Sequence, residues 1–157
     1  MHKFPVHLLE QAGLLAEMDK GKPRQASLRR AVSTAYYSVF HLLTISAVTN
    51  WKRSRQRPQL ARAFEHKRMN SACRKIKQAQ FQKVSADIVK HLKSIATAFM
   101  QLQEARHRAD YDNAKKWTRT EVLTHIESAK GAFDSWEIIC REPCADDFLL
   151  QLLIHRE

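Results

Sequence analysis

The chain has 157 residues, a formal net charge of +11 and 44% hydrophobic residues, which suits one domain with a single core. Only three glycines and four prolines leave too little turn chemistry for an all-β fold. The sequence holds no Gly-rich phosphate loop and no G-x-G-x-x-G motif. No apolar run approaches the roughly 20 residues of a membrane span, and the first residues lack a signal-peptide pattern. We therefore expect a cytoplasmic protein that does not bind membranes.

The three cysteines, Cys73, Cys140 and Cys144, are too few and too widely spread for a zinc site. They are the usual reduced thiols of a cytosolic protein. We expect no metal and no cofactor.

The hydrophobic periodicity predicts an all-α, up-down bundle of five to six helices in a single domain over residues 1–157. The first helix covers residues 7–18 and ends at a Gly/Pro stop near Pro23. The second covers residues 25–50 and is apolar around much of its circumference, which is typical of a central helix.

A polar stripe interrupts the second helix at i, i+4, i+7 and i+11, on one face within about 40°. Its members are Arg30, Thr34, Tyr37 and His41. Buried polar groups need partners. The stripe is therefore either a self-satisfied structural network that fixes helix register or the wall of a polar, ligand-facing cleft.

Residues 51–58 and 77–84 are expected to be basic loops on either side of a third helix over residues 59–76. Between Lys52 and Lys83 the chain has eleven Lys or Arg residues and a single acid, Glu65. This asymmetry favours a face that binds a polyanion, and a merely solvated basic helix is the alternative. The expected RNA-binding residues are Arg53, Arg55, Arg57, Arg62, Lys67, Arg68 and Arg74.

The fourth helix, over residues 86–109, has the clearest apolar stripe, which runs from Ile88 to Leu102 at 4-3-4-3 spacing. Four residues further on, the stripe reaches Arg106, which therefore points in the same direction as Ile88. An arginine at the end of a core stripe either extends to solvent or reaches into a polar pocket between helices. We expect a partly buried cleft near Asp110 and the Tyr37/His41 face.

The C-terminal part is predicted to form two more helices. Thr118 and Glu121 have the spacing of a capping box for the fifth helix. A sixth helix over residues 145–154 carries four large apolar side chains that either the bundle or a second chain must cover: Phe148, Leu149, Leu152 and Leu153. This unpaired apolar face is one reason to expect a two-fold homodimer.

The segment around Arg106 has the residue types of metal-independent RNA cleavage. A histidine, His107 or His66, would move a proton at the ribose 2′-OH or at the leaving oxygen. Arg106 would neutralise charge on the phosphate. The simpler alternatives are an i, i+4 ion pair between Arg106 and Asp110 and a surface histidine at position 107.

Two segments together resemble the HEPN superfamily, small helical domains of prokaryotic defence and toxin–antitoxin systems. Tyr-Tyr-Ser-Val-Phe-His at residues 36–41 is similar to the signature of the second HEPN helix. Residues 106–112 resemble the R-x-x-A-D-Y-D segment of a branch in which the catalytic motif is degenerate. Residues 64–74 are similar to this branch as well.

The resemblance implies a HEPN-like bundle, commonly a homodimer, in which the polar motifs face a cleft at the interface. It implies an RNA-acting protein, either a metal-independent endoribonuclease toxin or a non-catalytic RNA- or nucleotide-binding regulatory module. In the enzyme, Arg106 would stabilise the phosphate, and Asp110 and Tyr111 would orient the proton-transferring histidine. A cognate antitoxin such as a nucleotidyltransferase-like protein is the implied partner. A purely structural interaction protein is a third alternative.

The chain departs from the active family at one position. Active HEPN ribonucleases have four to six residues between the arginine and a histidine, whereas the positions at that distance after Arg106 are Tyr111, Asp112 and Asn113. The only literal match to that spacing is Arg119 with His125, whose side chains would lie about 120° apart on a regular helix.

Overall fold

The computed structural model describes residues 1–154 and has helices but no strands over that range. The helices are α1 (Lys3–Glu17), α2 (Gln25–Thr49), a 3-10 turn η1 (Ser54–Gln56), α3 (Arg57–Ala61), α4 (His66–Gln78), α5 (Ala86–Tyr111), α6 (Arg119–Ile139) and α7 (Pro143–Leu153). The all-α fold expected from the sequence is confirmed.

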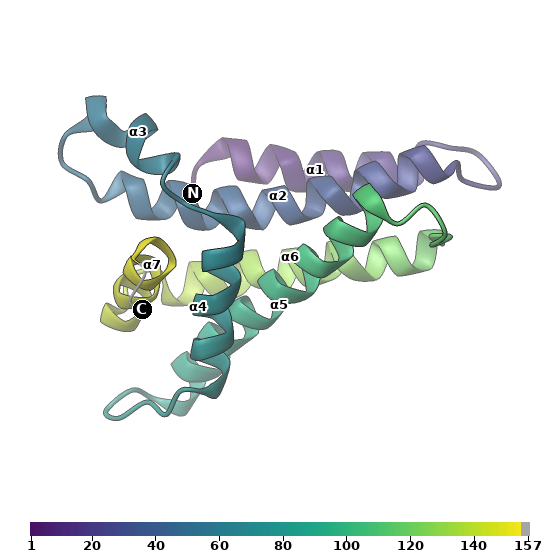
Figure 1. Ribbon diagram of the computed structural model, residues 1–157. Coiled ribbons are helices and arrows are strands. Elements are labelled where there is room, and N and C mark those ends of the chain that lie inside the picture. Colours follow the sequence, from purple (N-terminus) through teal and green to yellow (C-terminus); the bar gives the residue numbers. More distant parts are fainter. Residues whose placement is uncertain (155–157) are drawn as a thin grey trace.

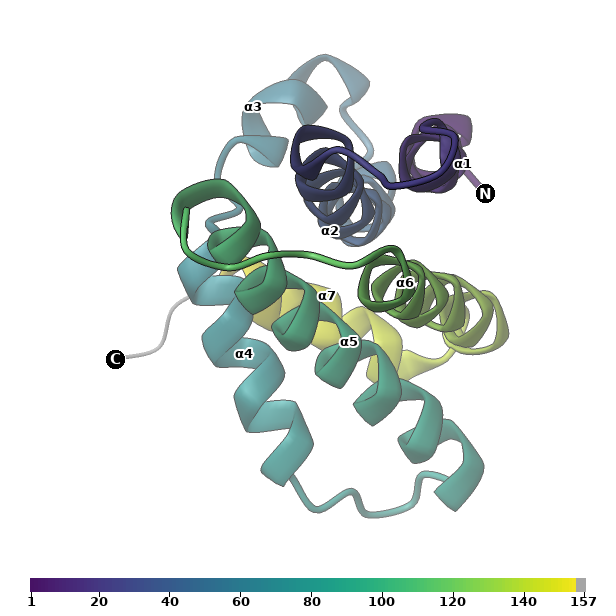
Figure 2. The ribbon, with the colours of Figure 1, turned by 90° about the vertical axis from the view of Figure 1, so that its right-hand side faces the viewer.

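Helix α2 packs against α1, α5 and α6 (Figures 1 and 2). Its residues Ala35, Val39 and Leu43 are fully buried, as its apolar circumference requires. Within the described residues, α2 is the one helix long and apolar enough to match a membrane span, and 67% of the matching window is buried inside the bundle. Burial among α1, α5 and α6 accounts for its apolar character.

Helix α5 crosses beneath α2 and contacts α4 and α6 as well (Figure 2). Its stripe residues Leu92, Phe99 and Leu102 are fully buried, which confirms the periodicity in the sequence. At the start of α6, the Thr118 hydroxyl accepts from the backbone N–H of Glu121, while the Glu121 carboxylate accepts from the backbone N–H of Thr118. The predicted capping box is therefore present.

The prediction of one helix over residues 59–76 is wrong. Phe64 turns inward and is only 6% exposed, and Glu65 is extended, so the chain changes direction between α3 and α4. Helix α3 packs on α2, whereas α4 packs on α5 and α7, and one straight helix could not serve both surfaces. Pro58 falls in the first turn of α3, where its missing N–H has no consequence, so part of the predicted loop 51–58 is helical.

The bundle itself covers α7. Phe148, Leu149 and Leu152 are between 0% and 5% exposed within one chain, because α7 packs against α4 and α2. The apolar face of this helix therefore provides no reason for a second chain. The exposed large apolar side chains here are Leu150 on α7 and Ile154 directly after it.

Candidate functional site

Arg106 lies where the α5 stripe meets α2, with its side chain 13% exposed. Its guanidinium carbon is 5.3 Å from the ring centroid of Tyr36 and 5.9 Å from that of Tyr37. Nη1 lies 3.5 Å from a carboxylate oxygen of Asp110, farther than in a tight charge-assisted hydrogen bond. Nε is buried and has no partner among the described residues. The guanidinium is thus surrounded by aromatic faces and only loosely paired.

His66 joins this cluster from the first turn of α4. Its Nδ1 and the Tyr36 hydroxyl share a hydrogen bond of 2.5 Å, and its ring lies 4.5 Å from the ring of Phe40. Burial is the main cause of the lowered pKa of His66, and the positive charge of Arg106 lowers it further. Burial also raises the pKa of Tyr36 well above its ordinary value. Both groups are therefore neutral near pH 7.

The polar stripe of α2 divides into two parts. Tyr37 and His41 lie in the aromatic cluster, with their ring centroids 6.2 Å apart, and burial lowers the pKa of His41. Thr34 is partly buried, whereas Arg30 is exposed. Only the C-terminal half of the stripe therefore lies with Arg106, as the sequence led us to expect for Tyr37 and His41.

The other candidate catalytic residues lie apart from the His66 cluster. His107 and Tyr111 are both exposed, and their rings contact each other at 5.0 Å. His107 is one of the residues that line the groove between α4 and α5. The structure thus brings Arg106, Asp110 and His66 together. His107 lines the same groove as Arg106 but does not join the aromatic cluster, and Tyr111 is exposed.

The groove between α4 and α5 has a volume of about 620 Å³. Lys67, Arg74 and Lys77 line it from α4, and Arg106 lies on the α5 side, while Glu104 is the only acid among the lining residues. Within the described chain, the three α4 cations form no ion pair and no side-chain hydrogen bond. Neighbouring cations with no acidic partners favour an anionic ligand.

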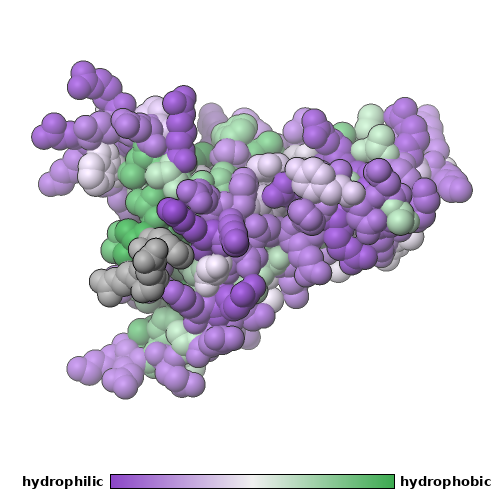
Figure 3. Space-filling model, in the orientation of Figure 1, coloured by the Kyte–Doolittle hydropathy of each residue, from purple (hydrophilic) through white to green (hydrophobic). Residues whose placement is uncertain are grey.

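The remaining basic residues have different surroundings. Arg53, Arg55 and Arg62 are exposed, and Figure 3 shows hydrophilic side chains projecting from this end of the molecule. Arg57 instead donates to the backbone carbonyls of Thr49 and Trp51, both at 2.9 Å, and so caps the C-terminus of α2. Arg68 lies 3.4 Å from Glu65. Arg57 therefore has a structural role at the end of α2, which the sequence did not predict.

Arg119 and His125, the literal match to the active spacing, do not form a site. Arg119 donates to the carbonyls of Ala16, Asp19 and Gly21, and so holds the C-terminal end of α1 against α6. The ring of His125 lies against Trp117, at 5.8 Å. The match in spacing is a coincidence of sequence.

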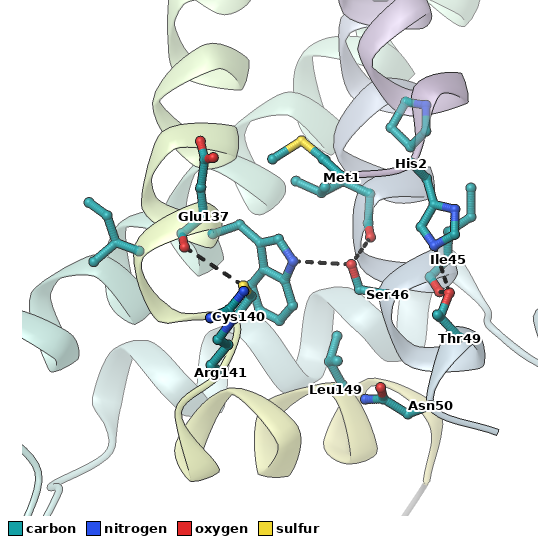
Figure 4. A pocket seen from close by; sticks show the side chains of 14 residues that line it. Met1, His2, Ile45, Ser46, Thr49, Asn50, Glu137, Cys140, Arg141 and Leu149 are labelled. Atoms are coloured by element: carbon teal, nitrogen blue, oxygen red, sulfur yellow. Dashed lines mark hydrogen bonds between the residues drawn. The ribbon is translucent and has the colours of Figure 1, made fainter. Parts of the chain in front are cut away.

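Another hollow, of about 650 Å³, lies between the ends of α1, α2, α6 and α7 (Figure 4). Ser46 accepts a hydrogen bond from the Trp136 indole there, and Thr49 bonds to His2. None of the catalytic, cleft or RNA-binding residues predicted from the sequence lines this hollow. Among residues 1–154, no group of three or more His, Cys, Asp and Glu side chains is placed to hold a metal ion.

The sequence does not show which residues of the cluster contact each other. Tyr36 and Phe40 fit an apolar helix face equally well, and the Tyr36–His66 bond joins residues thirty positions apart. Asn70 and Gln103, whose side chains bond to each other across the groove, belong to no motif. No family model matches the chain, and a search of curated proteins and of solved structures found no significant match.

Proposed function

We propose that this protein binds RNA through the groove between α4 and α5, as a HEPN-like domain. The observation that supports this most is the set of unpaired cations in the groove, Lys67, Arg74 and Lys77, with Arg106 at its α5 side. These cations suit the phosphates of a polynucleotide, because each phosphate contact releases condensed counterions and so favours binding.

Arg106 is suited to contact a phosphate. Its long contact with Asp110 leaves the guanidinium without a strong charged partner, and the rings of Tyr36 and Tyr37 hold its position. A phosphate oxygen would gain a preorganised cation in a partly desolvated place, where charge interactions are stronger than in water. The two sequence segments that resemble HEPN proteins contact each other at this residue.

RNA cleavage is a second candidate function, which the placement of His66 favours. A neutral His66 beside Arg106 could accept the proton of a ribose 2′-OH. For this, Nδ1 would carry its proton toward the Tyr36 oxygen, and Nε2 would be free as the base. Tyr36 would then set the tautomer of His66.

The biological setting belongs to the proposal through the resemblance alone. A HEPN-like protein of this kind would act in a toxin–antitoxin or defence system, as a homodimer and with a nucleotidyltransferase-like antitoxin. Light scattering at tens of micromolar protein, a range set by typical affinities, would detect the dimer. A monomer at that concentration would remove the dimer from the proposal.

RNA binding can be tested by the anisotropy of a labelled single-stranded RNA. The variant Arg74→Glu/Lys77→Glu should weaken binding at least tenfold, because two phosphate contacts become repulsive. Lys20→Glu/Lys22→Glu is the matched control, since both lysines are exposed and lie in the loop between α1 and α2. An equal loss of RNA affinity in both double variants would indicate a general effect of net charge. If neither variant lost affinity, the proposed groove would be contradicted.

Cleavage needs a separate assay with the same RNA in the presence of a chelator. An enzyme should lose cleavage in Arg106→Met and slow about a hundredfold in His66→Ala, as loss of a general base does. Intact RNA after prolonged incubation with the wild type would exclude the enzyme and leave the binding function.

A further inference from the structure

Trp51 is the most exposed tryptophan of the chain. It is 48% exposed, whereas Trp117 and Trp136 are 5% and 4% exposed. Within residues 1–154, no aromatic ring and no cation stacks on the Trp51 indole. The indole therefore exposes about half of its surface between α2 and η1, with no stacked partner there.

Hydrogen bonds on several sides hold this tryptophan in place. The indole Nε1 donates to the side-chain oxygen of Gln56 at 3.0 Å, which fixes the ring relative to η1. Its backbone N–H donates to the carbonyl of Val48, and its own carbonyl accepts from Arg57. A ring ordered in advance loses little conformational entropy when it binds a ligand.

The surroundings of Trp51 are uniformly positive. Lys52, Arg53 and Arg55 follow it directly, and all three are exposed. None of them takes part in an ion pair or a side-chain hydrogen bond within the described part of the chain. The sequence has no Asp or Glu from residue 20 to residue 64.

We infer that Trp51 stacks on an unpaired base of single-stranded RNA whose phosphates contact Lys52, Arg53 and Arg55. An exposed aromatic ring within a cluster of cations is the usual arrangement of a single-strand contact, because the ring takes the base and the cations take the backbone. The inference rests on the proposed RNA binding and specifies its substrate class. Base faces are hidden in a duplex, so single strands should be preferred.

A membrane surface is the other class of partner that tryptophan and arginine can serve. Binding at an interface needs a continuous apolar face. From residue 51 to residue 64, however, Leu60 is partly buried and Phe64 is buried, so Trp51 is the one exposed large apolar side chain of that segment. The arrangement therefore favours a nucleobase over a lipid surface.

Tryptophan fluorescence tests the inference directly, because the two buried tryptophans contribute a constant background. Titration with oligoadenylate should quench the emission of the wild type. Inorganic polyphosphate, which has charge but no bases, should bind without this quenching. Trp51→Ala should weaken binding of oligoadenylate about tenfold, in line with the stacking energy of one base. The affinity of Trp51→Phe for oligoadenylate should lie between those of the wild type and Trp51→Ala. The control variant Leu14→Ala, which changes a 72% exposed apolar side chain of α1, should bind as tightly as the wild type.

The outcomes separate this inference from the proposed function. If Trp51→Ala binds oligoadenylate as tightly as the wild type, with the same salt dependence, the stacking role is refuted and RNA binding stands. If labelled RNA does not bind the wild type at all, the proposed function fails and the inference fails with it. Quenching by vesicles of anionic lipid, without any by oligoadenylate, would assign Trp51 to a membrane surface and overturn the inference.

Discussion

Arg106 and Arg119 each extend from a helix into a partly buried place, yet their replacement should change stability by very different amounts. We expect Arg106→Met to change the free energy of unfolding by less than about 1 kcal/mol, and Arg119→Met to lower it by about 2 to 3 kcal/mol. Methionine keeps most of the apolar stem in both variants, so the comparison isolates the guanidinium.

The magnitudes follow from the partners of each guanidinium. Removing that of Arg106 eliminates two cation–π interactions worth about 0.5 to 1 kcal/mol each and a partly exposed ion pair worth about 0.5 kcal/mol. It also removes the buried, unpartnered Nε, whose desolvation costs about 1 to 3 kcal/mol. These effects nearly cancel.

For Arg119, no buried unpartnered nitrogen offsets the loss of its hydrogen bonds. Its Nε and Nη2 donate at 3.1 and 2.6 Å to the carbonyls of Ala16 and Asp19, with a weaker bond to Gly21 at 3.3 Å. Charge-assisted bonds contribute about 1.5 to 3 kcal/mol each, although water can replace part of that where the carbonyls are accessible.

Urea unfolding followed by circular dichroism measures both variants, and RNA anisotropy measures their binding. We expect Arg106→Met to fold normally but bind weakly, and Arg119→Met to be less stable but to bind normally when folded. If Arg106→Met is destabilised as much as Arg119→Met, Arg106 is a structural residue, and its role in the proposed site is refuted.

Three further predictions concern stability. His41, His66 and His125 have lowered pKa values, mainly because of burial, so the unfolded state takes up protons first as the pH falls. The protein should be most stable above about pH 6.5 and lose stability below it, and His66→Gln should reduce this slope in urea titrations at several pH values. Phe148→Ala should cost about 3 to 5 kcal/mol in urea unfolding, because the ring is fully buried in a single chain. A much smaller cost would contradict the packing of α7. Tyr36→Phe should cost about 1 kcal/mol through loss of the bond to His66, and no change would mean that this bond is not formed.

Periodicity was sufficient where one helix continues without interruption. A regular helix repeats its direction after eighteen residues, so the stripe of α5 predicted that Arg106 points inward, as Ile88 does. In the structure, its guanidinium lies beside Tyr37. The capping box at Thr118 was equally predictable from the sequence, since its two partners are three residues apart. Local spacing determines both features.

Features that depend on contacts between distant segments could not be predicted from the sequence. The helix breaks before α4 because the Phe64 side chain turns into the core. A phenylalanine at this position does not by itself predict such a break. Arg57 and Arg119 look like any other surface arginine until the carbonyls that they cap are known. The partner of Tyr36 was equally hidden, because His66 comes from another helix.

The most direct test of the proposed phosphate contact is the salt dependence of RNA binding by Arg106→Met. For single strands, the slope of log affinity against log salt changes by about 0.7 for each phosphate that the protein no longer neutralises. We predict a slope shallower by about that amount for Arg106→Met, and an unchanged slope for Lys22→Met, which removes an exposed charge in the loop between α1 and α2. The same slope and affinity in Arg106→Met as in the wild type would contradict a phosphate contact at this residue.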